Sequence, residues 1–417
     1  YLKDLNAKAI LVLEDYNGPA LTAANHLNIS VIRMSVRQQH LAGEFELLGE
    51  VHNSVKSEQV PSQNDIALIL HTSGTTSRPK IVPLLHSNIV SSAENIRESL
   101  SLSEQDICMN IMPLFHIHGL IAAVTASIGA GGSVWCTPGF DALKFFRWLD
   151  DVSPSWFTAV PTMHQAILGR SERNKNIIDR NKLRFLRSSS ASLPSQVMKE
   201  LERVFSAPII EGYGMTEATH QMASNPLPPS KQKPGSVGLE AGPKIRIAHE
   251  LENHLIDGTG EVVISGPNIT PGYENNVDAN KNSFFEFEGK RWFRTGDQGA
   301  FDADGYLTLT GRLKEIINRG GEKISPLEVD EVLMDHPGIV QVVTFAVPHK
   351  KLGEDVAAAV VLEENSGVTE TDLRAFAAER MVDFKVPKKI VILSEIPKGA
   401  TGKLQRIGLA EKLGLIK

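Results

Sequence analysis

Residues 66–80 of the chain are Ile66-Ala67-Leu68-Ile69-Leu70-His71-Thr72-Ser73-Gly74-Thr75-Thr76-Ser77-Arg78-Pro79-Lys80, an apolar run followed by a polar loop. The last nine of these residues include five hydroxyl side chains, one glycine and two cations. Such donors can surround the phosphates of a nucleotide, and a glycine lets the backbone approach closely. A Walker A loop is excluded, because Pro79 replaces its second glycine. A polar surface turn after a buried strand is the alternative interpretation.

The composition is that of an ordinary globular protein. The chain has 417 residues, of which 41% are hydrophobic and 22% are charged, enough for two or three domains. Its net charge of −6 argues against a nucleic-acid surface, so any bound nucleotide should be small. The two cysteines, Cys108 and Cys136, each lie in an apolar run. This favours two packed thiols in a reducing compartment over a disulfide or a metal site.

Neither end of the chain carries a recognisable targeting signal. No apolar run reaches the roughly 18 residues needed to cross a bilayer. The first residues lack the basic and then apolar layout of a signal peptide. The last three residues are not the peroxisomal address Ser-Lys-Leu. The sequence therefore predicts a cytoplasmic protein that acts away from membranes and nucleic acids.

Short apolar runs alternate with helix-like segments through the first half of the chain. Residues 1–60 have a strand–helix–strand order. Further strands are predicted at 107–112, 133–136, 156–160, 185–188 and 209–211, and helices at 87–100, 141–151, from Pro161 and at 195–205, with Ser87 as a helix cap. This alternation predicts a mostly parallel sheet covered by helices, with ligands at the carboxyl ends of the strands.

The pattern of predicted elements changes after about residue 234. Glycine-rich strands at 245–247, 262–264 and 306–309 predict a β subdomain. Helices at 325–335 and 369–380 and strands at 340–347 and 356–362 predict a small α+β domain, with Thr369 and Asp372 as a capping box. The predicted fold is therefore α/β, with a large domain at 1–311, a hinge at 312–314 and a small mobile domain at 315–417.

Four more clusters join the polar loop, and each alone has a mundane interpretation as a surface turn. They are Glu211-Gly212-Tyr213-Gly214-Met215-Thr216-Glu217, Arg294-Thr295-Gly296-Asp297, Gly311-Arg312-Leu313-Lys314 and Pro397-Lys398-Gly399-Ala400-Thr401-Gly402-Lys403. In this order the five segments resemble the acyl-adenylate-forming superfamily, which includes acyl-CoA synthetases, peptide-synthetase adenylation domains and luciferases. The similarity extends from about residue 60 to 410.

The resemblance implies a nucleotide site. In this family the phosphate loop would hold the β- and γ-phosphates of ATP through Thr72, Ser73, Gly74, Thr75, Thr76 and Lys80. The nucleotide would also contact Ser189, Ser190, Ala191, Glu211, Tyr213, Thr216, Asp297 and Arg312. Tyr213 would lie against the adenine, Thr216 would bind the α-phosphate, and Asp297 and Arg312 would bind the ribose. Glu217 would hold Mg2+, since a carboxylate is a hard oxygen ligand.

The resemblance also implies a reaction in two halves. A carboxylate displaces pyrophosphate from ATP to give an acyl-adenylate, and the thiol of coenzyme A then displaces AMP. Lys403 would meet the negative charge during adenylation, with Thr216, Glu217 and His116 as the other catalytic residues. The small domain would turn about Lys314 between the two steps. It would then present Gly320 and Gly321 to the pantetheine arm of CoA.

Within the superfamily, the segments 71–80, 188–193, 215–220 and 318–326 most resemble oxalate–CoA ligases. A second carboxylate needs donors where a fatty-acid pocket is apolar, and Ser190, His220 and His116 would supply them. His116 is interpreted as a gate beside the acid and His118 as packing. For His220 the alternative is a structural histidine. Activation of a medium-chain or aryl acid, and ATP or AMP binding without catalysis, are the alternative functions.

The sequence departs from the family pattern at three places. Ile81 follows Lys80 where glycine is usual, and Ser188-Ser189-Ser190 replaces a glycine pair, which suits the oxalate branch. The chain also begins within the large domain of the family, so the start of that domain is expected to be missing. None of these departures removes a predicted catalytic group.

Overall fold

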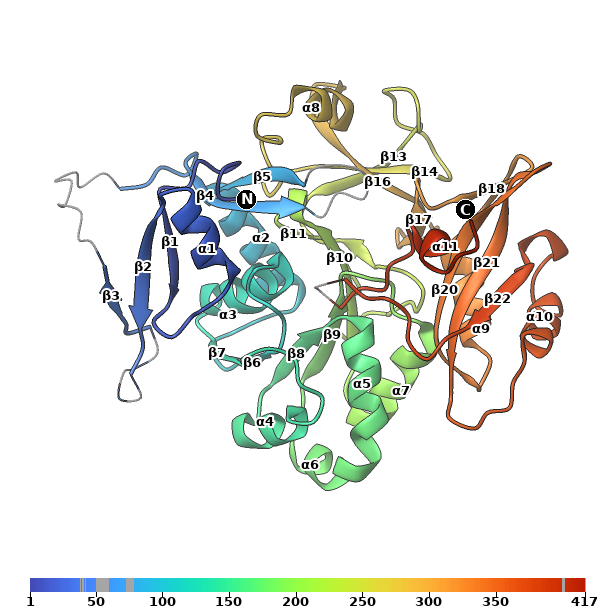
Figure 1. The fold of residues 1–417 in the computed structure, drawn as a ribbon, viewed down its shortest axis with the longest axis horizontal. Coiled ribbons are helices and arrows are strands. Elements are labelled where there is room, and N and C mark those ends of the chain that lie inside the picture. Colours follow the sequence, from blue (N-terminus) through green and yellow to red (C-terminus); the bar gives the residue numbers. More distant parts are fainter. Residues whose placement is uncertain are drawn as a thin grey trace. The chain divides into compact units, whose positions relative to one another are not determined.

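The structure, a computed structural model, describes residues 1–37, 39, 41, 43–49, 60–72, 79–399 and 402–416. It comprises two compact units, Tyr1–Pro61 and Ser62–Lys417 (Figure 1). No helix within these described ranges is long and apolar enough to cross a membrane. The residues Ser73, Gly74, Thr75 and Thr76, which the sequence predicts to bind phosphate, lie outside the described residues.

The first unit is a small three-stranded sheet with one helix. Strand β1 (Ala9–Leu13) pairs in parallel with β2 (Ser30–Ser35), which pairs antiparallel with β3 (Glu46–Leu48). Helix α1 (Pro19–His26) connects the parallel strands, and its proline lies in the first turn, where an N–H needs no partner. The predicted strand–helix–strand order is confirmed.

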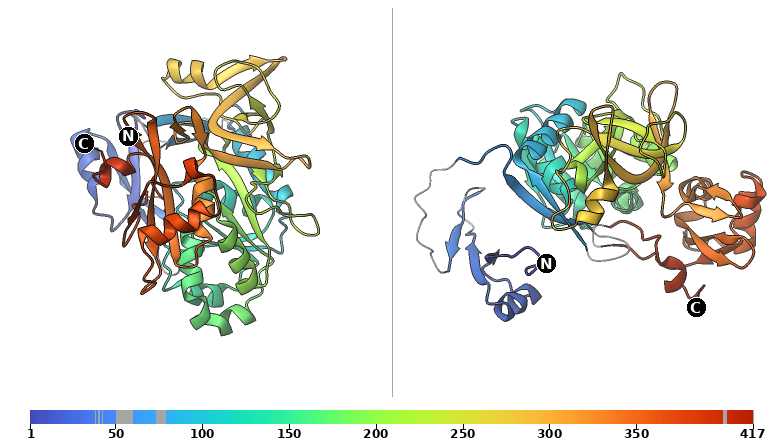
Figure 2. Two further views of the ribbon diagram at one scale, coloured as in Figure 1. Left: turned by 90° about the vertical axis from the view of Figure 1, so that its right-hand side faces the viewer. Right: turned by 90° about the horizontal axis from the view of Figure 1, so that it is seen from above.

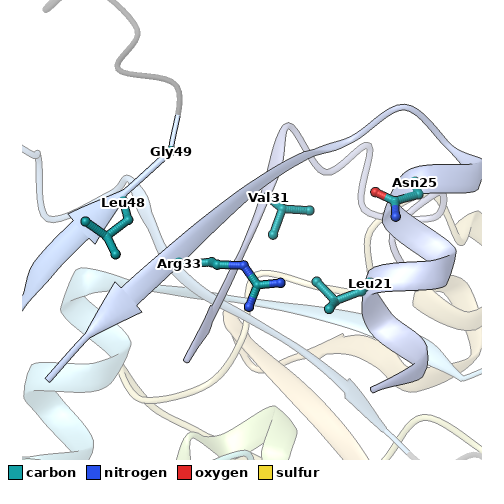
Figure 3. Close-up of a pocket in the computed structure, with 6 residues that line it drawn as sticks. All are labelled: Leu21, Asn25, Val31, Arg33, Leu48 and Gly49. Carbon is teal, nitrogen blue, oxygen red and sulfur yellow. The ribbon is translucent and has the colours of Figure 1, made fainter. Parts of the chain in front are cut away.

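This unit contains a pocket of about 380 Å³ between α1 and the sheet (Figure 3). Its lining residues are Leu21, Asn25, Val31, Arg33, Leu48 and Gly49. None of them is a predicted site residue. The Arg33 guanidinium donates to the carbonyl oxygens of Glu14 and Tyr16 at 2.5 and 3.3 Å. The Arg33 guanidinium in this pocket therefore stabilises the local backbone.

The second unit is built on a seven-stranded sheet of order β12-β11-β10-β9-β8-β6-β7. The strands from β7 to β10 are parallel, and β11 and β12 continue the sheet antiparallel. Their bounds are β6 (Ile107–Asn110), β7 (Ser133–Cys136), β8 (Trp156–Ala159), β9 (Phe185–Ser189), β10 (Ile209–Met215), β11 (His220–Ser224) and β12 (Leu239–Glu240). Every residue of β8 and β9 is buried. The predicted parallel sheet is confirmed.

Helices cover both faces of this sheet (Figure 1). Their bounds are α2 (His86–Ser99), η1 (His118–Thr125), α3 (Ala126–Gly129), α4 (Phe145–Val152), α5 (Pro161–Ser171), η2 (Glu172–Asn174), α6 (Lys175–Arg180), α7 (Ser195–Phe205) and η3 (Thr216–Ala218). Leu186 of β9 packs in the same cluster as residues of α4, α5 and α7, whereas Phe185 packs with residues of α2 and η1. Since strand side chains alternate, Arg187 lies on the α2 face, like Phe185.

The strand before the phosphate loop does not join the parallel sheet. Strand β4 (Ile66–Thr72) pairs antiparallel with β5 (Lys80–Leu85), which the sequence did not indicate. The predicted buried strand is therefore wrong in detail, because β4 is exposed at its start and only partly covered beyond it. The predicted cap at Ser87 is also wrong: α2 begins at His86, and the Leu85 N–H donates to the Asn88 side chain at 2.9 Å.

The predicted β subdomain is a five-stranded antiparallel sheet. Its elements are β13 (Lys244–Ala248), β14 (Gly260–Ser265), α8 (Val277–Ser283), β15 (Phe284–Phe287), β16 (Lys290–Phe301) and β17 (Leu307–Arg312). Strand β16 pairs with β14, β15 and β17 and so forms the centre of the sheet. In the β16–β17 ladder Asp297 stands opposite Arg312. Two residues predicted for the ribose site are thus neighbours across strands.

The last hundred residues form the second five-stranded sheet, β19-β18-β21-β20 with β22 beside β21. In Figure 2 these elements, in orange and red, form one group. Their bounds are β18 (Ile317–Arg319), β19 (Glu322–Ile324), α9 (Pro326–Met334), β20 (Ile339–His349), β21 (Gly353–Leu362), α10 (Glu370–Ala378), η4 (Asp383–Lys385), β22 (Lys389–Ile392) and α11 (Leu409–Lys412). Thr369 and Asp372 form the predicted capping box. The elements from β18 onwards are called the lid below.

Both cysteines are free thiols, but they differ in burial. Cys108 is buried in the core, and burial raises the pKa of its thiol. Cys136, at the end of β7, is exposed, so its predicted packing is wrong. It lies beside β6 at the sheet edge, where the neighbouring strand covers only one side.

Candidate active site

Several predicted site residues lie at or just after the carboxyl ends of two adjacent parallel strands. Ser189 ends β9 and is followed by Ser190 and Ala191, whereas Thr216 and Glu217 form the short helix η3 after β10. Strands β9 and β10 are neighbours in the sheet, so these two segments lie at the same edge. This is where parallel sheets bind ligands.

His118 lies at the centre of a buried polar cluster at this edge. Its side chain is fully buried, with Nδ1 3.1 Å from the Ser190 hydroxyl and Nε2 2.6 Å from the Thr158 hydroxyl. The ring of His220 is 5.4 Å away, centroid to centroid. The interpretation of His118 as packing is therefore incomplete, because its ring contacts a predicted substrate residue.

Two residues of this cluster have unusual backbone conformations. Ser190 has φ of 76° and His220 has φ of 100°, where side chains other than glycine are uncommon. Gly214 permits the second conformation, because a Cβ there would be 1.8 Å from the His220 carbonyl oxygen. Such backbone strain is often found at functional sites, where the surrounding structure enforces it. Here the two strained residues are both part of the buried polar cluster around His118.

The His220 imidazole is buried but has no partner among the described residues. Its side chain is 1% exposed, and neither ring nitrogen makes a hydrogen bond there. Burial, with the nearby Arg187 charge, keeps the pKa of His220 well below its usual value. The ring is therefore neutral, with one donor and one acceptor to offer. Since buried polar groups are nearly always paired, these nitrogens indicate a ligand.

Arg187 is a buried cation that sequence reasoning missed. It is 0% exposed, and its Nη2 donates to Gln221 at 3.2 Å. Its Nε and Nη1 have no partner, and no carboxylate pairs with it in the part of the chain described. Burial lowers its pKa only to about 10, so it keeps its charge at neutral pH. A cation buried without a counterion is costly, which favours an anionic ligand.

Tyr213, Asp297 and Arg312 are brought together as the sequence predicts. The Tyr213 hydroxyl donates to Asp297 Oδ2 at 2.5 Å, and Arg312 Nε lies 3.2 Å from Oδ1. Tyr213 and Asp297 are buried, whereas the Arg312 side chain is half exposed. The Asp297 charge raises the pKa of Arg312. This cluster offers an aromatic ring, a carboxylate and a guanidinium to one ligand.

Two residues predicted for the nucleotide use their side chains to hold the protein. The Ser189 hydroxyl donates to the Gly212 carbonyl oxygen at 2.6 Å. Glu211 accepts from the Leu193 N–H at 3.0 Å, and burial raises its pKa to about 8, so it is protonated at neutral pH. Both side chains thus hold the 189–193 loop in place.

Glu217 and Lys80 meet around Tyr273, another residue that sequence reasoning missed. The Tyr273 hydroxyl donates to Glu217 Oε1 at 2.7 Å, and Lys80 Nζ lies 4.3 Å from the centre of its ring. Burial lowers the pKa of Lys80, which Glu217 opposes and the Lys314 ammonium reinforces. Thr72 pairs with Lys80 across the β4–β5 hairpin.

Glu217 suits a metal ion that is held mainly by phosphates. No group of three or more potential ligands from His, Cys, Asp and Glu is placed to hold a metal within the described ranges. Mg2+ is often bound by one or two carboxylates together with substrate phosphates. With Oε1 held by Tyr273, Glu217 presents Oε2 for this purpose.

Lys403 reaches this site from the lid. Thr162 of α5 donates to the carbonyl oxygen of the preceding Gly402 at 2.8 Å. Burial and the Arg312 charge lower the pKa of Lys403 to about 8. Burial and Lys403 in turn lower the pKa of His116 to about 4, so His116 is neutral. Lys403, Arg312 and His116 are therefore close to one another.

The predicted hinge residue Lys314 lies near Lys80, and the predicted CoA glycines form a turn in the lid. Lys314 is exposed between β17 and β18. Gly320 and Gly321 form the turn of the β18–β19 hairpin with φ of 63° and 99°. The Gly320 N–H donates to the Leu352 carbonyl oxygen at 2.8 Å, which joins this turn to the β20–β21 turn. Among the described residues, no hydrogen bond joins the two glycines to the other predicted site residues.

An α/β sheet with polar and charged side chains at the carboxyl ends of its parallel strands has the usual arrangement of a ligand-binding site in such folds. The sequence matches the family model described as AMP-binding enzyme over residues 1–274, and its C-terminal domain model over residues 328–403. The chain belongs to this AMP-binding enzyme family. The predicted membership of the acyl-adenylate-forming superfamily is confirmed.

Relatives include two oxalate–CoA ligases. The one from Arabidopsis thaliana is 46% identical over 97% of this chain and 79% of its own length. The one from Saccharomyces cerevisiae is 40% identical over 99% of this chain and 79% of its own length. Among solved structures, ATP-bound MatB from Rhodopseudomonas palustris is 26% identical with a TM-score of 0.85, covering 99% of this chain and 80% of that one. These likenesses confirm the predicted fold class.

Proposed function

We propose that the protein is an AMP-forming CoA ligase that activates oxalate. The family match and the two oxalate–CoA ligases at 46% and 40% identity support this function. A carboxylate oxygen of oxalate attacks the α-phosphorus of ATP and displaces pyrophosphate. The sulfur of CoA then attacks the acyl carbon of oxalyl-AMP, and AMP leaves with the bonding electrons. The products are oxalyl-CoA, AMP and pyrophosphate.

The observation that carries the choice of a dicarboxylate is the unpaired Arg187 beside His220. The guanidinium offers two free nitrogens and the neutral imidazole offers one N–H. A second carboxylate would satisfy both, whereas the tail of a fatty acid would leave a buried cation unpaired. Ser190, held by His118 at 3.1 Å, supplies a further hydroxyl at the same place. His116 is proposed to close the acid pocket.

The nucleotide is proposed to be ATP, which the similar MatB structure binds. Tyr213 would contact the adenine, Asp297 and Arg312 the ribose, and Thr216 the α-phosphate. Lys80 and the 72–80 loop would hold the outer phosphates. Mg2+ bound through Glu217 would supply positive charge to the phosphate oxygens. The Tyr213–Asp297 hydrogen bond of 2.5 Å holds the carboxylate that the ribose hydroxyls would approach.

A panel of acids in a pyrophosphate-release assay tests this function. Oxalate, malonate, hexanoate and benzoate are compared at equal ATP, Mg2+ and CoA. We expect kcat/KM for oxalate to exceed that for hexanoate by at least about 10³-fold, because a site with buried polar groups rejects a substrate that leaves them unpaired. A preference for hexanoate or benzoate would identify a medium-chain or aryl acid ligase. Absence of AMP with every acid would indicate a binding protein without catalysis.

The Lys314→Pro variant tests the proposed hinge at 312–314. Proline fixes φ and also restricts the preceding residue, so rotation of the lid should be hindered. We expect thioester formation to slow about tenfold or more while oxalate-dependent ATP–pyrophosphate exchange changes little. Lys314→Ala is the control, because it removes the ammonium near Lys80 but leaves the backbone free. If both variants slow both steps alike, the pivot lies elsewhere.

A further inference from the structure

The segment that carries Lys403 is a short paired structure at the end of the chain. The Gly399 N–H donates to the Lys403 carbonyl oxygen at 2.8 Å, and the Gln405 N–H donates to the Pro397 carbonyl oxygen at 3.0 Å. Lys398 and Leu404 form an antiparallel bridge. These contacts are local, so they fix the shape of the segment but do not fix it to the body of the lid. Arg406 follows directly.

Arg406 ties this segment to two elements of the lid and to Glu315, which precedes the lid. Its Nη2 donates to Asp330 of α9 at 2.8 Å, and its Nε lies 3.2 Å from Glu315. Its Nη1 donates to the Thr344 carbonyl oxygen of β20. The three side chains that form the ion pairs are between 13% and 19% exposed. All three nitrogens of the guanidinium thus have a partner within a nearly buried site.

The partners of Arg406 are themselves fixed. Asp330 lies on α9, and its Oδ1 accepts from the Thr344 N–H at 2.6 Å, which joins α9 to β20. Glu315 is the first residue after the proposed hinge at 312–314, and its N–H donates to the Arg312 carbonyl oxygen at 2.8 Å. Arg406 therefore links the end of the hinge, the first long helix of the lid and its longest strand.

The chemistry of this site requires arginine. A planar guanidinium can donate to two carboxylates and a carbonyl in fixed directions, whereas a lysine ammonium is a single point charge. Burial raises the pKa of Asp330, and the Arg406 charge opposes that rise. A carboxylate left here without its cation would be an uncompensated buried charge, so the three groups depend on one another.

We propose that Arg406 is a positioning residue, which holds Lys403 at a fixed distance from the hinge so that rotation of the lid delivers and withdraws Lys403 as part of one rigid body. This inference rests on the proposed adenylation role of Lys403. A displacement of a catalytic group by about 1 Å can cost roughly 10²-fold in rate. The described residues 397–399 and 402–406 belong to no helix or strand, and the single Lys398–Leu404 bridge gives them little local structure to prevent such a displacement.

The two half-reactions test the proposal. In Arg406→Met we expect oxalate-dependent ATP–pyrophosphate exchange to fall by about 30- to 100-fold, while CoA thioester formation from preformed acyl-adenylate stays within about threefold. Arg406→Lys should recover only part of the loss, because it keeps one of the contacts. Glu315→Gln gives a milder change in the same direction if Arg406→Met folds poorly. Arg380→Met is the matched control, since Arg380 pairs with exposed Glu379 at 3.1 Å.

The titration of Lys403 gives a readout that does not depend on activity. An amine-selective acylating reagent and mass spectrometry measure its labelling against pH in the full chain. Wild-type Lys403 should titrate near pH 8, whereas in Arg406→Met the midpoint should move toward its ordinary value of 10.5 as Lys403 leaves its buried position. If no acid is activated by the wild type, the proposed function fails while this measurement still decides the inference. An unchanged midpoint in folded Arg406→Met, or equal losses in both half-reactions, would overturn it.

Discussion

Replacement of Lys403 by alanine is expected to abolish most adenylation and to spare thioester formation. A single donor placed where negative charge develops is typically worth about 10²- to 10³-fold in rate, and Lys403 is the ammonium that the lid brings beside Arg312 and His116. Oxalate-dependent ATP–pyrophosphate exchange should therefore fall by about this factor. The rate at which CoA consumes preformed oxalyl-AMP should stay within about threefold, because the lid would have withdrawn Lys403 by then.

Lys398→Ala is the matched control for this prediction. Lys398 lies in the same segment but pairs with Glu395 at 3.1 Å and faces solvent, so its loss should leave both half-reactions unchanged.

The pH dependence of adenylation gives a second check on the role of Lys403. Since the pKa of Lys403 is about 8, the free enzyme keeps the cation below that pH and loses it above. We expect kcat/KM for adenylation to decline above pH 8 in the wild type, and Lys403→Ala to lack this decline. Equal losses in both half-reactions would contradict the role.

The elements that could be predicted are those with strong local patterns. A central strand of the parallel sheet is largely apolar because it is buried on both faces, and Trp156–Ala159 is one example. Strand β16 was missed because Lys290–Phe301 contains charged residues and a glycine. It is a strand because three neighbouring strands pair with it, which no local pattern records. Strand β5 was missed because Pro83 interrupts it, which an edge position tolerates.

In the candidate site, too, residues in local motifs could be predicted from the sequence, whereas residues defined by long-range contacts could not. The motif residues Lys80, Asp297 and Arg312 were identified by their order along the chain, and Asp297 and Arg312 do meet across one ladder. Arg187 was missed because it occupies one position of an otherwise buried strand, and its lack of a counterion appears only when the surrounding side chains are in place. The polar contact of His118 depends on Thr158 and Ser190, which are distant in sequence. Long-range packing decides these features.

Arg187→Met is expected to remove most activity toward oxalate. If Arg187 pairs with the second carboxylate, its loss leaves that carboxylate buried without a counterion. Truncating one partner of a buried charge pair costs about 2–5 kcal/mol, which corresponds to roughly 30- to 5,000-fold in kcat/KM. The same change replaces a charge by an apolar chain of similar length, so hexanoate should be accepted better than by the wild type. The ratio of kcat/KM for oxalate to that for hexanoate is measured by pyrophosphate release. This ratio should fall by a larger factor than kcat/KM for oxalate itself, because kcat/KM for hexanoate rises.

Arg184→Met separates this role from a structural one. Arg184 lies three residues earlier, pairs with Asp106 at 2.9 Å and contacts the Phe185 ring, so its loss should lower the melting temperature without changing the preference for oxalate. A structural Arg187 would behave like Arg184: activity toward every acid would fall together with stability. The two outcomes differ in a ratio of substrates, which a partly unfolded sample does not alter. An unchanged ratio in folded Arg187→Met would mean that the buried guanidinium serves the sheet and that the second carboxylate is bound elsewhere.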